Sequence, residues 1–311
     1  MPLRKSFWPA LLWGLSGTIA ISINAHAEPI EGKRSPSEIV DAATPSAWRD
    51  VSPGALAVFE IEGRGDVFVE LTDRFAPKTA AQFKHLVSAG FYDGLSFYRV
   101  IENFVAQGGD PFGNETLPEG AMPTLPPEFE TGVQSDLGNP IISLKDDYAD
   151  KTSFYKGFAY GIESQSEKAW LLSCTGTLAF GREVGRDTAS SEFYFTLQPQ
   201  RYLDRNMSLF GRVLEGSEHL QALSRQLPPE DKEDPVGDQI TRVWLGNAPP
   251  SDRQTPEFQV LKTDTAVFRD YVEARANRPE AFFYVRPNHV NACALQIPVR
   301  RKPVDSTGQA Q

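Results

Sequence analysis

Two cysteines and four histidines are the side chains of this sequence that best suit metal or redox chemistry. No spacing among them matches a zinc site, so metal chemistry is not expected. The cysteines, Cys174 and Cys293, could instead form a disulfide in an oxidising compartment. Such a bond would close a loop of about 120 residues and stabilise the fold by about 4–5 kcal/mol. Two buried free thiols are the alternative, because a sequence does not show that the two sulfurs meet.

The first 27 residues have the pattern of an export signal. Arg4 and Lys5 precede an uncharged stretch, residues 6–27, that is rich in large apolar side chains. It ends in Ala25-His26-Ala27, a small–x–small pattern typical of cleavage sites. A retained membrane anchor is the alternative, but residues 7–23 fall just short of the ~20 residues needed to span a bilayer. We therefore expect cleavage after Ala27, a periplasmic location, and no stable membrane insertion of the mature chain.

The composition is that of a folded, acidic chain. Hydrophobic residues make up 40% of the 311 residues and aromatic residues 11%, enough to bury a substantial core. The net charge is −10, and it becomes −12 when residues 1–27, with two basic and no acidic side chains, are removed. This charge argues against nucleic acid as a partner. The 24 prolines predict long ordered loops.

Short strands and two helices are predicted between residues 54 and 246. Residues 58–62 and 67–71 alternate in polarity around a glycine-rich connection, which predicts a β-hairpin. A helix is expected from Pro77 to about Gly90, because its apolar residues recur on one face. A strand that runs into a turn is expected at 95–110. Further strands are expected at 177–180, 193–197, 209–214 and 240–245, and a short helix at 217–223. This pattern favours a mainly β fold, a closed or nearly closed antiparallel barrel with helices over its ends.

The flanking segments are interpreted by composition. Residues 28–53 are polar with four prolines, which predicts an N-terminal linker. Residues 111–140, rich in proline, glycine and acids, are predicted to be loop. Beyond residue 246 we expect a C-terminal extension, residues 247–311, with an amphipathic helix at 265–277 and a disordered tail from Arg300.

One long segment carries a specific resemblance. Residues 97–110 read Phe-Tyr-Arg-Val-Ile-Glu-Asn-Phe-Val-Ala-Gln-Gly-Gly-Asp. They resemble the signature F-[HY]-R-[VI]-I-x-x-F-x-x-Q-G-G-D of the cyclophilin-type peptidyl-prolyl isomerases, exported bacterial members included. Further matching blocks follow in family order at 176–180, 191–195, 202–204 and 210–216. The resemblance covers residues 54–246, with an insertion within 112–175, and implies a cyclophilin-like closed eight-stranded antiparallel barrel capped by two helices.

The resemblance implies rotation about Xaa-Pro bonds, with no cofactor and no metal. The amide barrier of ~20 kcal/mol comes from resonance, and in the twisted transition state the lone pair localises on the prolyl nitrogen. A fixed donor aimed at that nitrogen stabilises this state more than the planar ones. Arg99 occupies the motif position for this donor, and its alternative role is a structural salt bridge. Gln107 is the expected partner that binds substrate backbone and helps to hold Arg99; its alternative role is to cap a turn.

The remaining candidate substrate-binding residues also come from the resemblance. Phe104 is expected to be the floor of a proline pocket. Val105, Tyr194 and Leu203 are also expected to bind substrate. The remaining predicted substrate-binding residues depart from the family pattern: Gly181, Glu192, Tyr202 and Met207. Glu192 replaces a usual glutamine and could pair with Arg99. Gly181-Arg182-Glu183 replaces Ala-Asn-Ala at the edge that normally pairs with substrate backbone. Tyr202 and Met207 replace tryptophan and histidine, which argues against strong cyclosporin sensitivity.

Two functions from different classes are consistent with these residues. The leading hypothesis is an exported peptidyl-prolyl cis–trans isomerase that acts on proline-containing polypeptides, with envelope proteins as candidate clients. The alternative is a peptide-binding or chaperone module of low activity on a cyclophilin scaffold, as the changes at Glu192 and residues 181–183 suggest. In addition, the insertion and the extension would either dock a partner or simply pack on the barrel.

Overall fold

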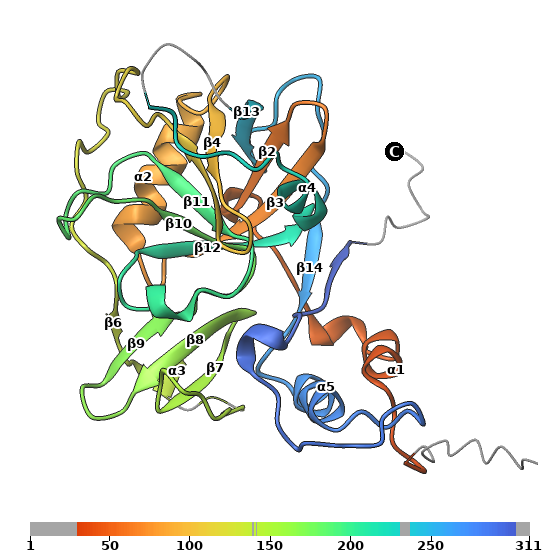
Figure 1. Cartoon of the computed structure of the whole chain (residues 1–311). Helices are drawn as coiled ribbons and strands as arrows, with labels where there is room; N and C mark the ends of the chain where they lie inside the picture. Colours follow the sequence, from red (N-terminus) through yellow and green to blue (C-terminus); the bar gives the residue numbers. More distant parts are fainter. Residues whose placement is uncertain (1–29, 139, 141, 231–236, 303–311) are drawn as a thin grey trace, which may run out of the picture.

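The computed structural model describes residues 30–138, 140, 142–230 and 237–302, so the predicted signal peptide lies outside the described residues. Eight antiparallel strands close into a barrel in the order β10-β11-β5-β4-β13-β2-β3-β12 (Figure 1). Their bounds are β2 (Leu56–Ile61), β3 (Gly65–Leu71), β4 (Ser96–Val100), β5 (Val105–Gly109), β10 (Thr177–Phe180), β11 (Phe193–Thr196), β12 (Leu209–Glu215) and β13 (Asp238–Leu245). Helices α2 (Pro77–Ser88) and α4 (Ser217–Gln221) pack against these strands. The predicted mainly β barrel is confirmed.

Aromatic rings fill the interior of the barrel. The hairpin β2–β3 pairs Phe59 with Val67, and both side chains are fully buried. The apolar face of α2 places Phe83 against Phe59, with ring centroids 6.0 Å apart. The chain leaves this helix at Gly90, whose φ of 70° is the left-handed conformation that glycine adopts without strain. Period-2 strands and one amphipathic helix thus share a single core.

The insertion forms a small sheet of its own. Its elements are β6 (Thr131–Gly132), α3 (Ser135–Gly138), β7 (Lys151–Tyr155), β8 (Phe158–Glu163) and β9 (Lys168–Leu171). The four strands are antiparallel in the order β6-β9-β8-β7, next to the barrel (Figure 1). Apart from β6 and α3, most of the described residues between 111 and 140 are loop, as predicted.

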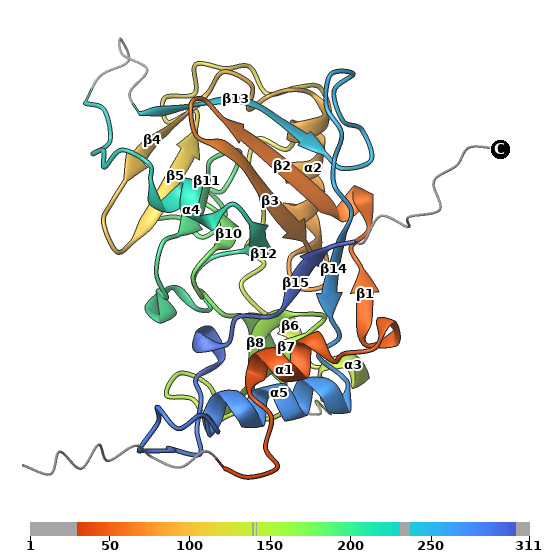
Figure 2. The same ribbon diagram turned by 90° about the vertical axis from the view of Figure 1, so that its right-hand side faces the viewer.

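The prediction of a linker at 28–53 is wrong for its described part. Residues 30–55 contain α1 (Pro36–Asp41), β1 (Trp48–Asp50) and two 3₁₀ turns, η1 (Pro45–Ala47) and η2 (Pro53–Ala55). Strand β1 pairs with β14 (Phe258–Leu261), and β14 pairs with β15 (Val299–Arg301). Figure 2 shows α1 lying against α5 (Ala266–Ala276), the predicted helix of the extension. The two flanks therefore build a second core together.

The tail prediction is also wrong at its start. Arg300 lies in β15 opposite Gln259, and its guanidinium donates to the Gln259 side chain and lies 4.1 Å from a Trp48 ring centre. Residues 303–311 lie outside the described residues. Across the described ranges, no helix combines the length and the apolar character that a membrane span needs.

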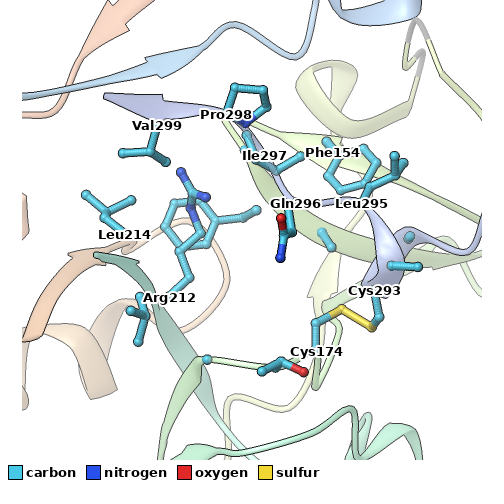
Figure 3. Close-up of a pocket in the computed structure, with 18 of the residues that line it drawn as sticks. Phe154, Cys174, Arg212, Leu214, Cys293, Leu295, Gln296, Ile297, Pro298 and Val299 are labelled. Atoms are coloured by element: carbon cyan, nitrogen blue, oxygen red, sulfur yellow. A yellow bond between two sulfur atoms is a disulfide. The ribbon is translucent and has the colours of Figure 1, made fainter. Parts of the chain in front are cut away.

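Cys174 and Cys293 form a disulfide in the structure. Cys174 precedes β10, and Cys293 lies in the 3₁₀ turn η4 (Ala292–Ala294), so the bond ties the extension to the barrel. It borders a cavity of about 870 Å³ between the barrel, the insertion and the extension (Figure 3). None of the predicted substrate-binding residues lines this cavity.

Candidate active site

Arg99 and Gln107 lie opposite each other on the neighbouring strands β4 and β5. Nη1 of Arg99 donates a hydrogen bond of 3.1 Å to Oε1 of Gln107. Among the residues that the structure describes, no carboxylate forms an ion pair with Arg99. A neutral amide therefore holds the guanidinium, and its charge remains available for another group.

An aromatic surface lies beside this cation. Phe104 is in the turn between β4 and β5, and its ring centre is 5.2 Å from Cζ of Arg99. The ring of Tyr202 stacks on Phe104 with centroids 6.3 Å apart and is 59% exposed. The result is an accessible apolar surface next to a fixed positive charge.

The other predicted apolar pocket residues gather in the same place. Val105 and Tyr194 are buried in one hydrophobic cluster, against which Phe104, Leu203 and Met207 pack. They come from β5, β11, the 3₁₀ turn η3 (Arg201–Leu203) and the turn that follows it. The fold thus brings together residues that are up to about a hundred positions apart in the sequence.

A buried ion network fixes η3, the turn that carries Tyr202 and Leu203. Nε of Arg201 donates to Oδ2 of Asp204 at 2.7 Å, and Oδ1 of Asp204 accepts the backbone N–H of Ser173 at 2.8 Å. The Arg201 guanidinium also donates two hydrogen bonds to Asp146 of the insertion, at 2.6 and 2.8 Å. Burial raises the pKa of Asp204, and the Ser173 backbone and Arg201 partly offset this. The insertion therefore braces one wall of the pocket.

The sheet of the insertion also packs beneath the pocket. Phe158, Tyr160 and Leu171 belong to the hydrophobic cluster that contains Val105 and Tyr194. The Tyr160 hydroxyl donates to the Leu137 carbonyl, which ties β8 to α3. The insertion is therefore part of the support of the pocket.

Glu192 contacts Gln107, and no contact between Glu192 and Arg99 is found in the described structure. Nε2 of Gln107 donates to Oε2 of Glu192 at 3.2 Å and to the Tyr98 hydroxyl at 2.5 Å. Burial raises the pKa of the Glu192 carboxyl, against the opposing effect of hydrogen bonds from Tyr98 and Gln107. Burial and the nearby Glu192 charge also raise the pKa of Tyr98. Glu192 therefore does not compete for Arg99, contrary to the expectation from the sequence. It accepts a hydrogen bond from Gln107, the residue that holds Arg99.

The edge at residues 181–183 is held close to this network. The backbone N–H of Gly181 donates to the Glu192 carbonyl at 2.8 Å. A Cβ at position 181 would lie 3.1 Å from Nε2 of Gln107, so glycine leaves room for the amide. The Arg182 side chain donates to the carbonyls of Asn206 and Glu183, and its Cζ lies 5.4 Å from the ring centre of Phe129.

Sequence reasoning missed three contributors to this site. Tyr98 occupies the His/Tyr position of the motif. The alternation of residues along β4 does not predict its hydrogen bond with Gln107. Phe129 and Tyr160 come from the insertion, where no motif assigns roles. Chemically, the site offers an oriented cation, an apolar surface and an amide, an arrangement suited to stabilising electron density that develops on an atom bound above Phe104.

Comparison with known proteins adds independent evidence. The sequence pattern of the family described as "Cyclophilin type peptidyl-prolyl cis-trans isomerase/CLD" matches residues 56–244. Peptidyl-prolyl cis-trans isomerase ppi1 of Schizosaccharomyces pombe is 32% identical over 152 residues, which cover 49% of this chain and 74% of that protein. Peptidyl-prolyl cis-trans isomerase B of Bacillus subtilis is 31% identical over 166 residues, 53% of this chain and 88% of that protein.

A solved structure extends the likeness in fold. The crystal structure of cyclophilin AquaCyp293 from Hirschia baltica superposes with a TM-score of 0.66 at 24% identity. The superposition covers 88% of this chain and 100% of that one, so the similarity in fold reaches beyond the barrel.

Proposed function

Because this chain belongs to the cyclophilin-type peptidyl-prolyl cis–trans isomerase family, we propose that it isomerises Xaa-Pro bonds in exported polypeptides and so assists their folding. The observation that carries the proposal is the placement of Arg99, held by Gln107 and positioned 5.2 Å from the Phe104 ring centre. Family membership supports the reaction class, and the export context is our own proposal.

The mechanism follows from the electronic structure of the amide. A prolyl ring bound on Phe104 would place its nitrogen near the Arg99 guanidinium. As the bond twists, resonance is lost and the nitrogen lone pair becomes a hydrogen-bond acceptor, which it is not in either planar state. A guanidinium that is already oriented then stabilises the transition state selectively. The side chain of Gln107 keeps the donor in place, and no bond to carbon or nitrogen is broken.

The first test is catalysis by residues 28–311 on an acetylated Xaa-Pro tetrapeptide amide. Uncatalysed exchange takes tens of seconds at 25 °C. We expect the chain to accelerate it strongly, measured by magnetisation exchange between the cis and trans signals without a coupling protease. A folded chain that binds the peptide and leaves the exchange rate unchanged would contradict the proposed function.

That contrary outcome would favour the alternative, a peptide-binding or chaperone module. The motivating observation is the loop after β10, where the Glu183 backbone N–H is bonded to the Thr188 hydroxyl at 2.9 Å. A backbone donor at the substrate edge is thus satisfied within the chain. A binding module would retain peptide affinity after Arg99→Ala, with no turnover to lose.

Export is proposed from the N-terminal pattern and from the disulfide. Residues 1–27 end in a small–x–small site, and a Cys174–Cys293 bond persists in an oxidising compartment. Envelope proteins are the corresponding clients.

The export proposal predicts that protein recovered from a periplasmic fraction has the intact mass of residues 28–311. An Ala27→Leu variant, with a bulky residue at the cleavage position, is expected to accumulate as the precursor. Recovery of the parent only at the mass of residues 1–311 would instead support the retained anchor.

A further inference from the structure

Glu192 closes a hydrogen-bond network around the amide of Gln107. The two amide hydrogens of Gln107 go to the Tyr98 hydroxyl at 2.5 Å and to Oε2 of Glu192 at 3.2 Å. Both N–H groups of the amide therefore already donate hydrogen bonds, and its oxygen accepts from Arg99.

The donor and acceptor inventory makes this arrangement directional. An ionised carboxylate only accepts hydrogen bonds, so it can face only the NH₂ end of Gln107. Rotation of the amide by 180° would place its oxygen against the carboxylate and its NH₂ against the guanidinium, which removes two favourable contacts. The chain leaves space for this geometry at Gly181, where a Cβ would lie 3.1 Å from Nε2 of Gln107 and 3.6 Å from Glu192.

From this geometry we propose that Glu192 is a positioning residue that, in its ionised form, fixes the Gln107 amide and through it the Arg99 guanidinium. The inference rests on the isomerase activity proposed above and adds a regulatory element to it. A protonated Glu192 presents an O–H donor, which can turn toward Oε1 of Gln107 and compete with Arg99 for it.

The charged and titratable groups that face Glu192 set the pH range of this effect. Tyr98 comes from β4, Asp110 follows β5, and Glu183 follows β10, whereas Arg99 of β4 is bonded to Gln107. The carboxylates of Glu183 and Asp110 act in the same direction as burial, and all three favour the neutral form of Glu192. Asp110 itself is buried, and its carboxylate accepts the backbone N–H groups of Phe112 and Glu115.

The test is the pH profile of kcat/KM between pH 4.5 and 8, by the exchange assay on a peptide with no titrating group. The kcat/KM of the parent is expected to fall about tenfold toward the acid end of this range, which is the effect of losing one charge-assisted hydrogen bond. The kcat/KM of Glu192→Gln is expected to stay within about threefold of the plateau value of the parent. Its profile should lack the decrease at low pH, the acid limb. Glu192→Ala, checked for folding by circular dichroism, is expected to remain about tenfold below the parent plateau at every pH.

Glu183→Gln is the matched control, because it removes a neighbouring carboxylate that makes no bond to Gln107. It should keep the acid limb and move its midpoint to lower pH, since one like charge near Glu192 is gone. An acid limb that persists unchanged in Glu192→Gln, or the absence of a limb in an active parent, would overturn the inference. So would a folded Glu192→Ala variant with unchanged kcat.

A second readout does not require activity. The side-chain amide nitrogen and proton signals of Gln107 are expected to shift with pH in the parent and to stay constant in Glu192→Gln. If the parent shows no isomerisation, the proposed function fails, while this titration still tests the placement of Gln107. Signals that are independent of pH in the parent, or that move identically in both proteins, would overturn the proposal.

Discussion

Replacement of Arg99 by alanine is expected to lower kcat/KM about 10²–10³-fold while the fold persists, the usual effect of losing one preoriented donor. The guanidinium is the side chain that the structure holds beside the Phe104 ring, and Gln107 fixes its direction. Alanine removes the transition-state interaction and leaves the apolar surface of Phe104 and Tyr202, so peptide affinity should change far less than turnover. Exchange rates and peptide binding, measured on the same preparation, separate the two effects.

Two variants control for this result. Arg99→Lys keeps a positive charge but loses the planar fork, so we expect a rate between those of the parent and Arg99→Ala. Arg225→Ala removes an arginine that pairs with Glu102 on the surface, and it should change the rate less than about twofold. An Arg99→Ala variant that keeps the parent rate would show that another group supplies the donor.

The barrel was predictable because the residue patterns that specify its strands and its helix each lie within one short segment of the sequence. The hairpin around Phe59 and Val67 alternates with period 2, and the face of α2 that carries Phe83 repeats with the helical period. The site was predictable because Arg99, Phe104 and Gln107 lie within nine residues of one another and match a long motif. Antiparallel pairing of β4 with β5 then brings Arg99 opposite Gln107 with little freedom of register.

The second core was not predictable because no single segment carries it. Ile39 and Trp48 are two of the few large apolar residues in a polar, proline-containing stretch, and Phe268 lies more than two hundred residues later. Each becomes buried only when β1 pairs with β14 and α1 meets α5. A pattern read along the chain does not contain that pairing, so the stretch resembled a linker.

The support of the pocket by the insertion was hidden for the same reason. Tyr160 and Phe158 lie on a short strand whose sequence carries no specific motif. They share a hydrophobic cluster with Val105, which is distant from them in the sequence. The polar network around Gln107 was partly hidden as well. The change to Glu192 was visible, but the hydrogen bond from Gln107 to the Tyr98 hydroxyl was not.

The double variant Cys174→Ser/Cys293→Ser is expected to be less stable than the parent by about 4–5 kcal/mol, because the closed loop is long. The bond joins residues separated by 119 positions, so it removes many conformations from the unfolded chain and few from the folded one. The folded chain has independent contacts across the same interface, where Leu172 packs in the cluster of Phe268 and Leu295. The extension should therefore remain docked at 25 °C, and isomerase activity should persist. Urea unfolding followed by tryptophan fluorescence, to which Trp48 and Trp170 of that cluster contribute, measures the loss.

Reductant supplies the control for this prediction. Dithiothreitol should destabilise the parent to the level of the double variant and leave the variant itself unchanged, because no other cysteine is present. Alkylation of the unfolded parent without reductant should add no mass, since both sulfurs are bonded to each other. Two alkyl adducts under those conditions would mean that the thiols are free. Equal unfolding midpoints for the oxidised parent and the variant would show that the extension is held by packing alone.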